Sequence, residues 1–160
     1  MPISPVLDDT SLVLDTDILN DWRFEKPYVQ QAIENYESRL KSLPALTSIN
    51  VFEALHGFEK EDARRKGDDE RRKRDRIRIE HLIQSCLILP FDENAARIAA
   101  YAFPRLSRNE QKKHWQDLFI AAIALAHGHG VATRNRRDFE LIANHLPPTH
   151  PTLRLAVWKP

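Results

Sequence analysis

Short runs of consecutive apolar residues recur along the chain, and longer stretches with apolar residues at helical spacing separate them. Consecutive apolar residues are typical of strands in a parallel sheet that is covered on both faces. We expect such strands at residues 11–15, 45–47, 86–89 and 131–133. We expect helices at residues 27–42, 49–65, 93–103, 117–127 and 138–145. Because strands alternate with helices, the pattern predicts an α/β domain with a mainly parallel central sheet.

Three segments depart from this alternation. Residues 59–80 hold ten Lys or Arg and eight Asp or Glu, which predicts a solvated, charged helical hairpin over about residues 59–84. Residues 104–116 are polar and basic, and we expect them to form a loop. The tail at residues 153–158 alternates apolar and polar residues, which predicts an edge strand.

Composition narrows the class of protein. The length of 160 residues and the 42% share of hydrophobic residues fit a single domain, 1–160, with a core at about residues 11–140. The net charge of +1 does not indicate any class of partner, so any nucleic-acid affinity must come from local basic patches. The single cysteine, Cys86, excludes an internal disulfide. Without a signal-peptide pattern or a membrane span, we expect a cytoplasmic protein that makes no use of a membrane.

Acidic residues occur at three places where a buried element is expected. Asp15 directly follows the apolar run Leu12–Leu14, and a charge beside a buried strand is costly unless something pairs with it. Glu53 shares a face with apolar residues on a helix that should be largely buried. Asp117 opens the strongly apolar helix 117–127. Because ligands bind beyond the carboxyl ends of parallel strands, we expect these acids to meet at that edge of the sheet.

Each polar residue also has a purely structural interpretation. Asp15 and Asp117 are favourable N-caps for the helices that follow them, and Glu53 could form a buried ion pair with an arginine. Asn135 and Asp138 follow the last of the core strands and would reach the same edge. For Asp138 the favoured interpretation is an N-cap.

Carboxylates gathered at one edge repel one another and raise one another's pKa. A hard divalent cation relieves this repulsion, and oxygen ligands suit Mg²⁺, with Mn²⁺ as a possible substitute. Zinc is disfavoured, because no thiolate cluster is available and the histidines lack HExxH spacing. The acids therefore predict a magnesium site formed by Asp15, Glu53 and Asp117.

In DLFIAAIALAHGHGVATRNRRDF (117–139), an acid, an Ala-rich helix and a Thr-Arg-Asn strand end follow one another. Together with LVLDTDIL (12–19), LTSINVFEALHG (46–57) and LPFDENAARIAA (89–100), this segment resembles the PIN-domain family, and within it the VapC-type toxins of bacterial toxin–antitoxin pairs. By position, Asp15, Glu53 and Asp117 match the family's acids, and Asn135 stands where the family often has a fourth. The resemblance implies a three-layer α/β/α fold, a homodimer, a Mg²⁺-dependent endoribonuclease and a cognate antitoxin that neutralises it.

We therefore expect metal-assisted hydrolysis of RNA phosphodiesters. Asp15 and Asp117 would hold one Mg²⁺, and Glu53 would bind a second ion or orient a water. Asn135 would ligate through its amide oxygen or position a water. RNA approaching an acidic pocket needs a basic rim. The candidates are Arg134, Arg136, Arg137, Lys112 and Lys113.

Two other functions stay open on the sequence alone. Asp15-Thr16-Asp17 after a strand fits the nucleophile motif of phosphatases of the haloacid dehalogenase type, although that class needs Gly-Thr-like residues where Ile18-Leu19 follow. A non-catalytic RNA-binding module of the same fold is the second, because Asn135 is not a carboxylate. Phosphate release without RNA cleavage would support the first, and Mg²⁺ binding without turnover would support the second.

Overall fold

The computed structural model describes residues 3–64 and 70–160, so residues 65–69 of the predicted charged hairpin lie outside the described residues. The strands of the described part are β1 (Ile3–Pro5), β2 (Leu12–Leu14), β3 (Leu46–Thr47), β4 (Ile88–Leu89), β5 (Gly130–Thr133) and β6 (Leu153–Val157). Its helices are α1 (Thr16–Arg23), α2 (Pro27–Leu40), α3 (Ser48–Ala63), α4 (Glu70–Ser85), α5 (Glu93–Ala102), the short 3-10 helix η1 (Phe103–Arg105), α6 (Arg108–Ala126) and α7 (Arg136–Ala143).

The paired strands of the described residues all run parallel. Four of them form a sheet in the order β1-β6-β5-β2. The pair β3-β4 continues beyond β2, because a bridge joins Val13 to Ala45. Parallel strands place their carboxyl ends at one edge, so the residues that follow β2, β3 and β5 face the same side of the molecule. The predicted α/β class with a mainly parallel sheet is confirmed.

The prediction of an edge strand at residues 153–158 is wrong. β6 pairs in parallel with β1 on one side and with β5 on the other, so it lies inside the sheet. The edge strand is β1, which is too short to give a periodic signal and ends in a proline. An interior strand is covered on both faces, and Leu153, Leu155 and Ala156 are accordingly buried.

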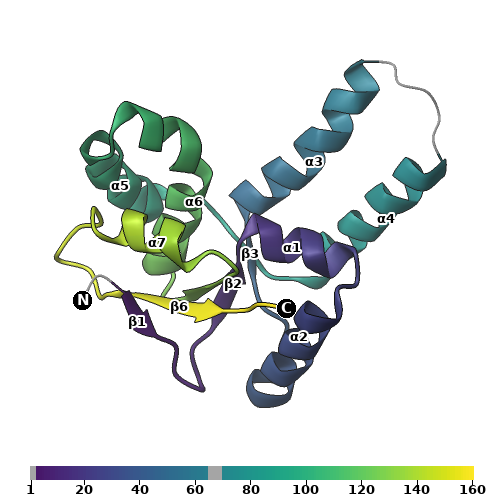
Figure 1. Cartoon of the computed structure of the whole chain (residues 1–160), viewed down its shortest axis with the longest axis horizontal. Helices are drawn as coiled ribbons and strands as arrows, with labels where there is room; N and C mark the ends of the chain where they lie inside the picture. Colours follow the sequence, from purple (N-terminus) through teal and green to yellow (C-terminus); the bar gives the residue numbers. More distant parts are fainter. Residues whose placement is uncertain (1–2, 65–69) are drawn as a thin grey trace.

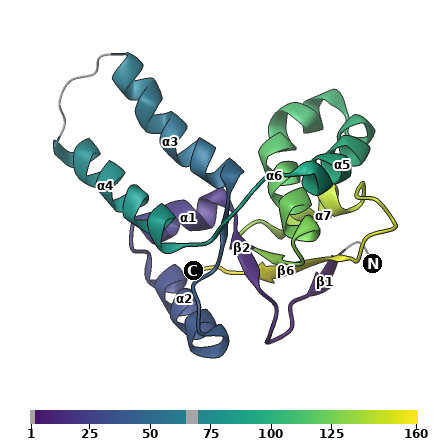
Figure 2. The same ribbon diagram turned by 180° about the vertical axis from the view of Figure 1, so that it is seen from behind.

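Helices cover both faces of the sheet and complete the predicted three layers. Helices α5, α6 and α7 lie on one side, and α1, α2, α3 and α4 lie on the other (Figures 1 and 2). Side chains of strand β2 pack into the cores on both faces of the sheet, since successive side chains of a strand point to opposite faces. Val13 belongs to the core cluster under α5–α7, whereas Leu12 and Leu14 belong to the cluster under α1–α4.

Helix α6 begins nearer the N-terminus than predicted. Residues from Arg108 onward are helical, so the predicted loop at 104–116 is mostly helix and Asp117 lies inside α6 rather than at its start. Ser107 caps the helix: its hydroxyl accepts from the backbone N–H of Glu110 (3.2 Å), and the Glu110 carboxylate accepts from the backbone N–H of Ser107 (2.7 Å). The first turns lack an apolar stripe, which hides them from a periodicity argument.

Helices α3 and α4 form the two arms of the charged hairpin and project from the body of the molecule (Figure 1). Ion pairs join them across the hairpin, with Arg76 2.5 Å from Glu59 and Arg72 2.7 Å from Asp62. Among the described residues of α4, only Ile79 is buried. The hairpin therefore encloses little core of its own.

Burial raises the pKa of the Cys86 thiol to about 11, which keeps the thiol protonated.

Two glycines provide a matched test of this packing. A Cβ added at Gly130 would lie 2.9 Å from the backbone oxygen of Arg154 and 3.1 Å from a methyl carbon of Leu12, whereas one added at Gly57 would meet nothing within 4 Å. We expect G130A to lose about 1–3 kcal/mol of unfolding free energy through strain. We expect G57A to gain about 0.5–1 kcal/mol, because alanine favours helix. Thermal unfolding should show opposite shifts of Tm, and equal shifts would contradict the packing of β5 against β6.

Among the described residues, none of the helices combines the length and the apolar character that are needed to cross a lipid bilayer.

Candidate active site

Asp15 ends strand β2 and begins helix α1. Its backbone N–H donates to Ala132 of β5 (3.0 Å), which continues the strand pairing by one residue. One carboxylate oxygen accepts from the backbone N–H of Ile18 (2.8 Å), so Asp15 is the N-cap of α1. The other accepts from the Thr133 hydroxyl (2.5 Å). The side chain is only 4% exposed, and both interpretations of Asp15, as a cap and as a site residue, fit this geometry.

Glu53 reaches the same region from α3. Its carboxylate accepts a hydrogen bond from the Thr16 hydroxyl (2.7 Å), and that hydroxyl accepts from the Asn50 amide (3.1 Å). Asn50 also closes the capping box of α3 with Thr47, so the start of α3 is tied directly to the start of α1. Within residues 3–64 and 70–160 Glu53 has no ion pair with an arginine, so the buried-pair interpretation does not hold for the described part.

Asp117 and Asp138 meet between α6 and α7. Asn135, not Asp138, caps α7, and its amide nitrogen donates to the Asp138 carboxylate (2.6 Å). His114 Nδ1 lies 4.0 Å from the same carboxylate. One possible ligand atom each of His114, Asp117 and Asp138 lies within 4.8 Å of the others, which makes these three a possible metal site.

Sequence reasoning missed His114 altogether. The segment around it was expected to be a loop, and the side chain is in fact buried on α6. His114 and Asp117 are three residues apart, which places them on one face of a helix. The signal that could have revealed this is the Ser107–Glu110 capping box, which sets the start of the helix before His114.

These side chains surround one pocket of about 410 Å³ at the carboxyl edge of the sheet. The predicted site residues Asp15, Glu53, Asp117 and Asn135 all line it, together with Thr16, Asp17, Asn20, Lys113, Gln116, Asp138 and Phe139. The structure thus brings together four residues that are far apart in the sequence. Asp17 is exposed and lies 3.7 Å from Arg134, with which it forms an ion pair.

Three carboxyl groups of the pocket, those of Asp15, Glu53 and Asp117, have raised pKa values. Burial raises the pKa of Asp15 to about 7, against the hydrogen bonds from Thr133 and Ile18, which lower it. Burial raises the pKa of Asp117 to about 7 as well, and the charges of Asp15, Asp138 and Glu53 add to the effect. Burial also raises the pKa of Glu53. Like charges that are crowded and partly desolvated resist ionisation unless a cation joins them.

The donor set suits a hard divalent cation. Five acidic side chains line the pocket, and Mg²⁺ and Mn²⁺ accept carboxylate oxygens as ligands. Each ionised carboxylate offers about four lone-pair positions, so the hydrogen bonds to Asp15 and Glu53 fix their orientation and leave positions for a metal. A cation would also relieve the repulsion that raises the pKa values. The residues present therefore fit the predicted kind of metal.

Two of the five residues of the predicted basic rim form ion pairs with nearby acids. Arg134 pairs with Asp21 (3.0 Å) as well as with Asp17, and Arg136 pairs with Glu140 (2.6 Å). Lys113 lines the pocket, whereas Lys112 and Arg137 are exposed on the surface. Trp115 lies on α6, where its ring makes a T-shaped contact with that of Phe119.

The fold and the pocket define an α/β/α protein with a carboxylate site at the carboxyl ends of its parallel strands. Within that class the chain belongs to the PIN-domain family, whose sequence model, described as PIN domain, matches residues 12–144. No curated protein sequence matches the chain.

Solved structures of VapBC complexes contain chains of similar fold. A chain of DNA-bound VapBC from Salmonella typhimurium is 23% identical, with 94% of this chain and 99% of that chain covered and a TM-score of 0.69. A chain of VapBC2 from Rickettsia felis, bound to a promoter DNA fragment, is 18% identical, with 92% and 98% covered and a TM-score of 0.66. A chain of VapBC-5 from Mycobacterium tuberculosis is 19% identical, with 92% and 98% covered and a TM-score of 0.60. At these identities the likeness establishes the fold.

The raised pKa values predict how stability depends on pH without metal. The pKa of Asp15 is 3.8 in an ordinary setting and about 7 in the folded protein, so the folded state holds this proton more strongly than the unfolded state. The associated stability is present below about pH 4 and is lost as the pH rises through 7, by at most about 4 kcal/mol. Urea unfolding in EDTA at pH 5 and pH 8 should show this loss in the wild type and a smaller loss in D15N.

The matched control is E93Q, which removes an exposed carboxylate on α5, far from the pocket. We expect E93Q to keep the wild-type dependence on pH. A D15N protein with the wild-type dependence would contradict the unusual protonation of Asp15.

Proposed function

We propose that this protein is a Mg²⁺-dependent endoribonuclease and the toxin of a toxin–antitoxin pair. The observation that carries the proposal is the convergence of Asp15, Glu53 and Asp117 on one pocket, where burial and mutual repulsion raise their pKa. Such a pocket is unfavourable as a purely structural feature, because buried carboxylates without cationic partners destabilise the fold. Membership in the PIN-domain family supports the same activity.

Asp15 and Asp117 would hold the metal, with Glu53 binding a second ion or orienting a water. A bound Mg²⁺ would supply a Lewis acid at the phosphate and lower the pKa of a nearby water. The chain itself keeps the carboxylates in place. The Thr133 hydroxyl orients Asp15, and the Thr16 hydroxyl orients Glu53.

In this proposal, Asn135 and Asp138 together take the role of the fourth acid that the family often has. The Asn135 amide oxygen faces the backbone N–H of Asp138 (3.4 Å), and its amide nitrogen donates to the Asp138 carboxylate. Asn135 is therefore better suited to position Asp138 than to bind a metal directly. Asp138 then contributes the charge, and His114 beside it offers a nitrogen ligand, which Mn²⁺ tolerates better than Mg²⁺.

The comparison with solved structures supports an antitoxin as a partner of the proposed toxin. Similar chains occur in VapBC complexes, and VapBC-5 is described as a member of a family of toxin–antitoxin systems. We propose that a cognate antitoxin binds this protein and blocks the pocket, and that the RNA substrate is met in the cytoplasm. The homodimer stays a prediction, which light scattering of the purified protein would test.

Substitution of Asp15 tests the activity. D15N keeps the size of the side chain and an oxygen for the Ile18 N–H, but it removes the charge that a metal needs. We expect cleavage of a labelled single-stranded RNA in Mg²⁺ to fall by more than about 100-fold in D15N and in D117N, and to stay at the wild-type rate in E93Q.

Metal binding is measured independently through unfolding. At pH 8, Mg²⁺ at about 100 times its Kd should stabilise the wild type by about 2.7 kcal/mol, or roughly 5–11 °C in Tm, and should stabilise D15N much less. A D15N protein that cuts RNA at the wild-type rate would contradict the site. A wild type whose Tm rises with Mg²⁺ but which cuts no RNA would favour the non-catalytic alternative.

A further inference from the structure

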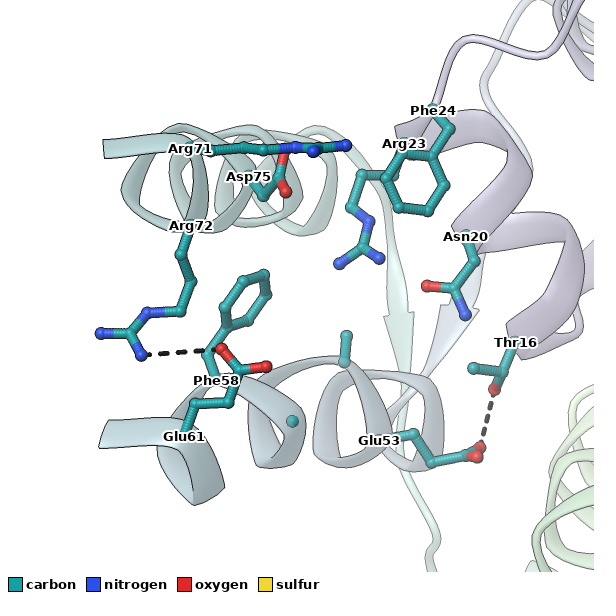
Figure 3. A pocket seen from close by; sticks show the side chains of 12 residues that line it. Thr16, Asn20, Arg23, Phe24, Glu53, Phe58, Glu61, Arg71, Arg72 and Asp75 are labelled. Atoms are coloured by element: carbon teal, nitrogen blue, oxygen red, sulfur yellow. Dashed lines mark hydrogen bonds and ion pairs between the residues drawn. The ribbon is translucent and has the colours of Figure 1, made fainter. Parts of the chain in front are cut away.

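A second pocket, of about 510 Å³, opens between α1, α3 and α4 (Figure 3). It adjoins the carboxylate pocket, because Thr16, Asn20 and Glu53 line both. A strand held at the carboxylates could therefore pass along α1 into the cleft between the arms of the hairpin. We call this pocket the hairpin cleft.

Arg23 points into the middle of the hairpin cleft (Figure 3). Its guanidinium carbon lies 4.4 Å from the centre of the Phe24 ring and 5.7 Å from that of Phe58. Its Nε is buried and has no hydrogen-bond partner within residues 3–64 and 70–160. A buried donor without an acceptor costs free energy, and a guanidinium offers a planar fork of donors that fits a phosphate. Within the described residues, Arg23 thus has a hydrogen-bond donor without a partner, to which an anion could bind.

The acids of the hairpin cleft do not satisfy Arg23. Glu61 is engaged by Arg72 (3.6 Å), which also pairs with Asp62. Asp75 acts on Arg23 only through its charge, and the described residues contain no hydrogen bond between the two. Arg71 lines the cleft as well.

The basic residues at the start of α7 offer a weaker path. Arg134 and Arg136 already pair with acids, Arg134 with Asp21 and Arg136 with Glu140. A phosphate would have to displace these partners, whereas it would give Arg23 an acceptor that it lacks. The exposed ring of Phe24 (48%) adds a surface on which a base could stack.

We propose that the hairpin cleft binds the RNA strand that leads away from the cleavage pocket, with Arg23 contacting a phosphate and Phe24 stacking on a base. This proposal rests on the proposed ribonuclease function. RNA is favoured over a protein partner because the cleft adjoins the pocket that would hold the scissile phosphate and places the Arg23 guanidinium beside it. A short acidic segment of a protein is the competing occupant, and the experiment separates the two.

The test measures equilibrium binding of a short fluorescein-labelled single-stranded RNA by anisotropy, in a D15N background that prevents cleavage. We expect R23Q to raise the Kd by at least about tenfold, because a charged hydrogen bond is lost. The slope of log affinity against log salt should fall by about 0.7, which corresponds to one phosphate contact on a single strand. R23K should keep most of the slope, because it keeps the charge.

Further variants separate the phosphate contact from other effects. R97Q is the matched control, because Arg97 is an exposed arginine of α5 that pairs with Glu93, and it should leave the Kd and the slope unchanged. F24A should weaken binding by at least about fivefold through lost stacking, with little change of slope. If R23Q fails to fold, as Tm would show, R23K and F24A still carry the test.

The two proposals fail in different ways. No cleavage by the wild type in Mg²⁺ would contradict the ribonuclease. Wild-type cleavage, with R23Q and F24A binding RNA like R97Q, would overturn the hairpin cleft alone. Unchanged RNA binding in R23Q, combined with weaker binding of a short acidic peptide, would assign the cleft to a protein partner and would also overturn the proposal.

Discussion

The position of Asp15 is the constraint on which the rest of the site depends. β2 and β5 lie side by side, and Asp15 extends their pairing by one hydrogen bond before the chain turns into α1. The carboxylate is thereby buried where the strands end, next to the Thr133 hydroxyl. Ionising a carboxyl group at this buried position costs free energy. Asp15 must therefore either keep its proton or have a cation bound beside it. The other acids face the same choice.

Short hydrogen-bond chains, rather than apolar contacts, set the relative positions of the acids. The Thr133 hydroxyl donates to Asp15 and accepts from the backbone N–H of Asn135, which joins the end of β5 to the starts of α1 and α7. The Thr16 hydroxyl joins Glu53 and Asn50 in the same way, which ties α3 to α1. Helix capping and site geometry are therefore produced by the same side chains. Loss of one hydroxyl would loosen a cap and misplace a carboxylate together.

The density of charged residues in the hairpin does not by itself locate a binding group. The arms of the hairpin form ion pairs with each other, whereas Arg23, whose Nε has no hydrogen-bond partner among the described residues, comes from α1. Between the arms and α1 the polar groups leave an open cleft next to the carboxylates. Within the described residues, Arg23 thus offers a cationic side chain whose Nε has no hydrogen-bond partner, beside the pocket that a polyanion would leave.

The sequence by itself determined the alternation of strands and helices, and with it the α/β class, because buried parallel strands require consecutive apolar residues. It also indicated Asp15, Glu53 and Asp117, since an acid beside an apolar run is conspicuous. Only the tertiary structure decided the place of β6 inside the sheet, the approach of His114 to Asp117 and Asp138, and the cleft around Arg23. Strand order and the partners of charged side chains depend on contacts between distant segments, and no local pattern records those contacts.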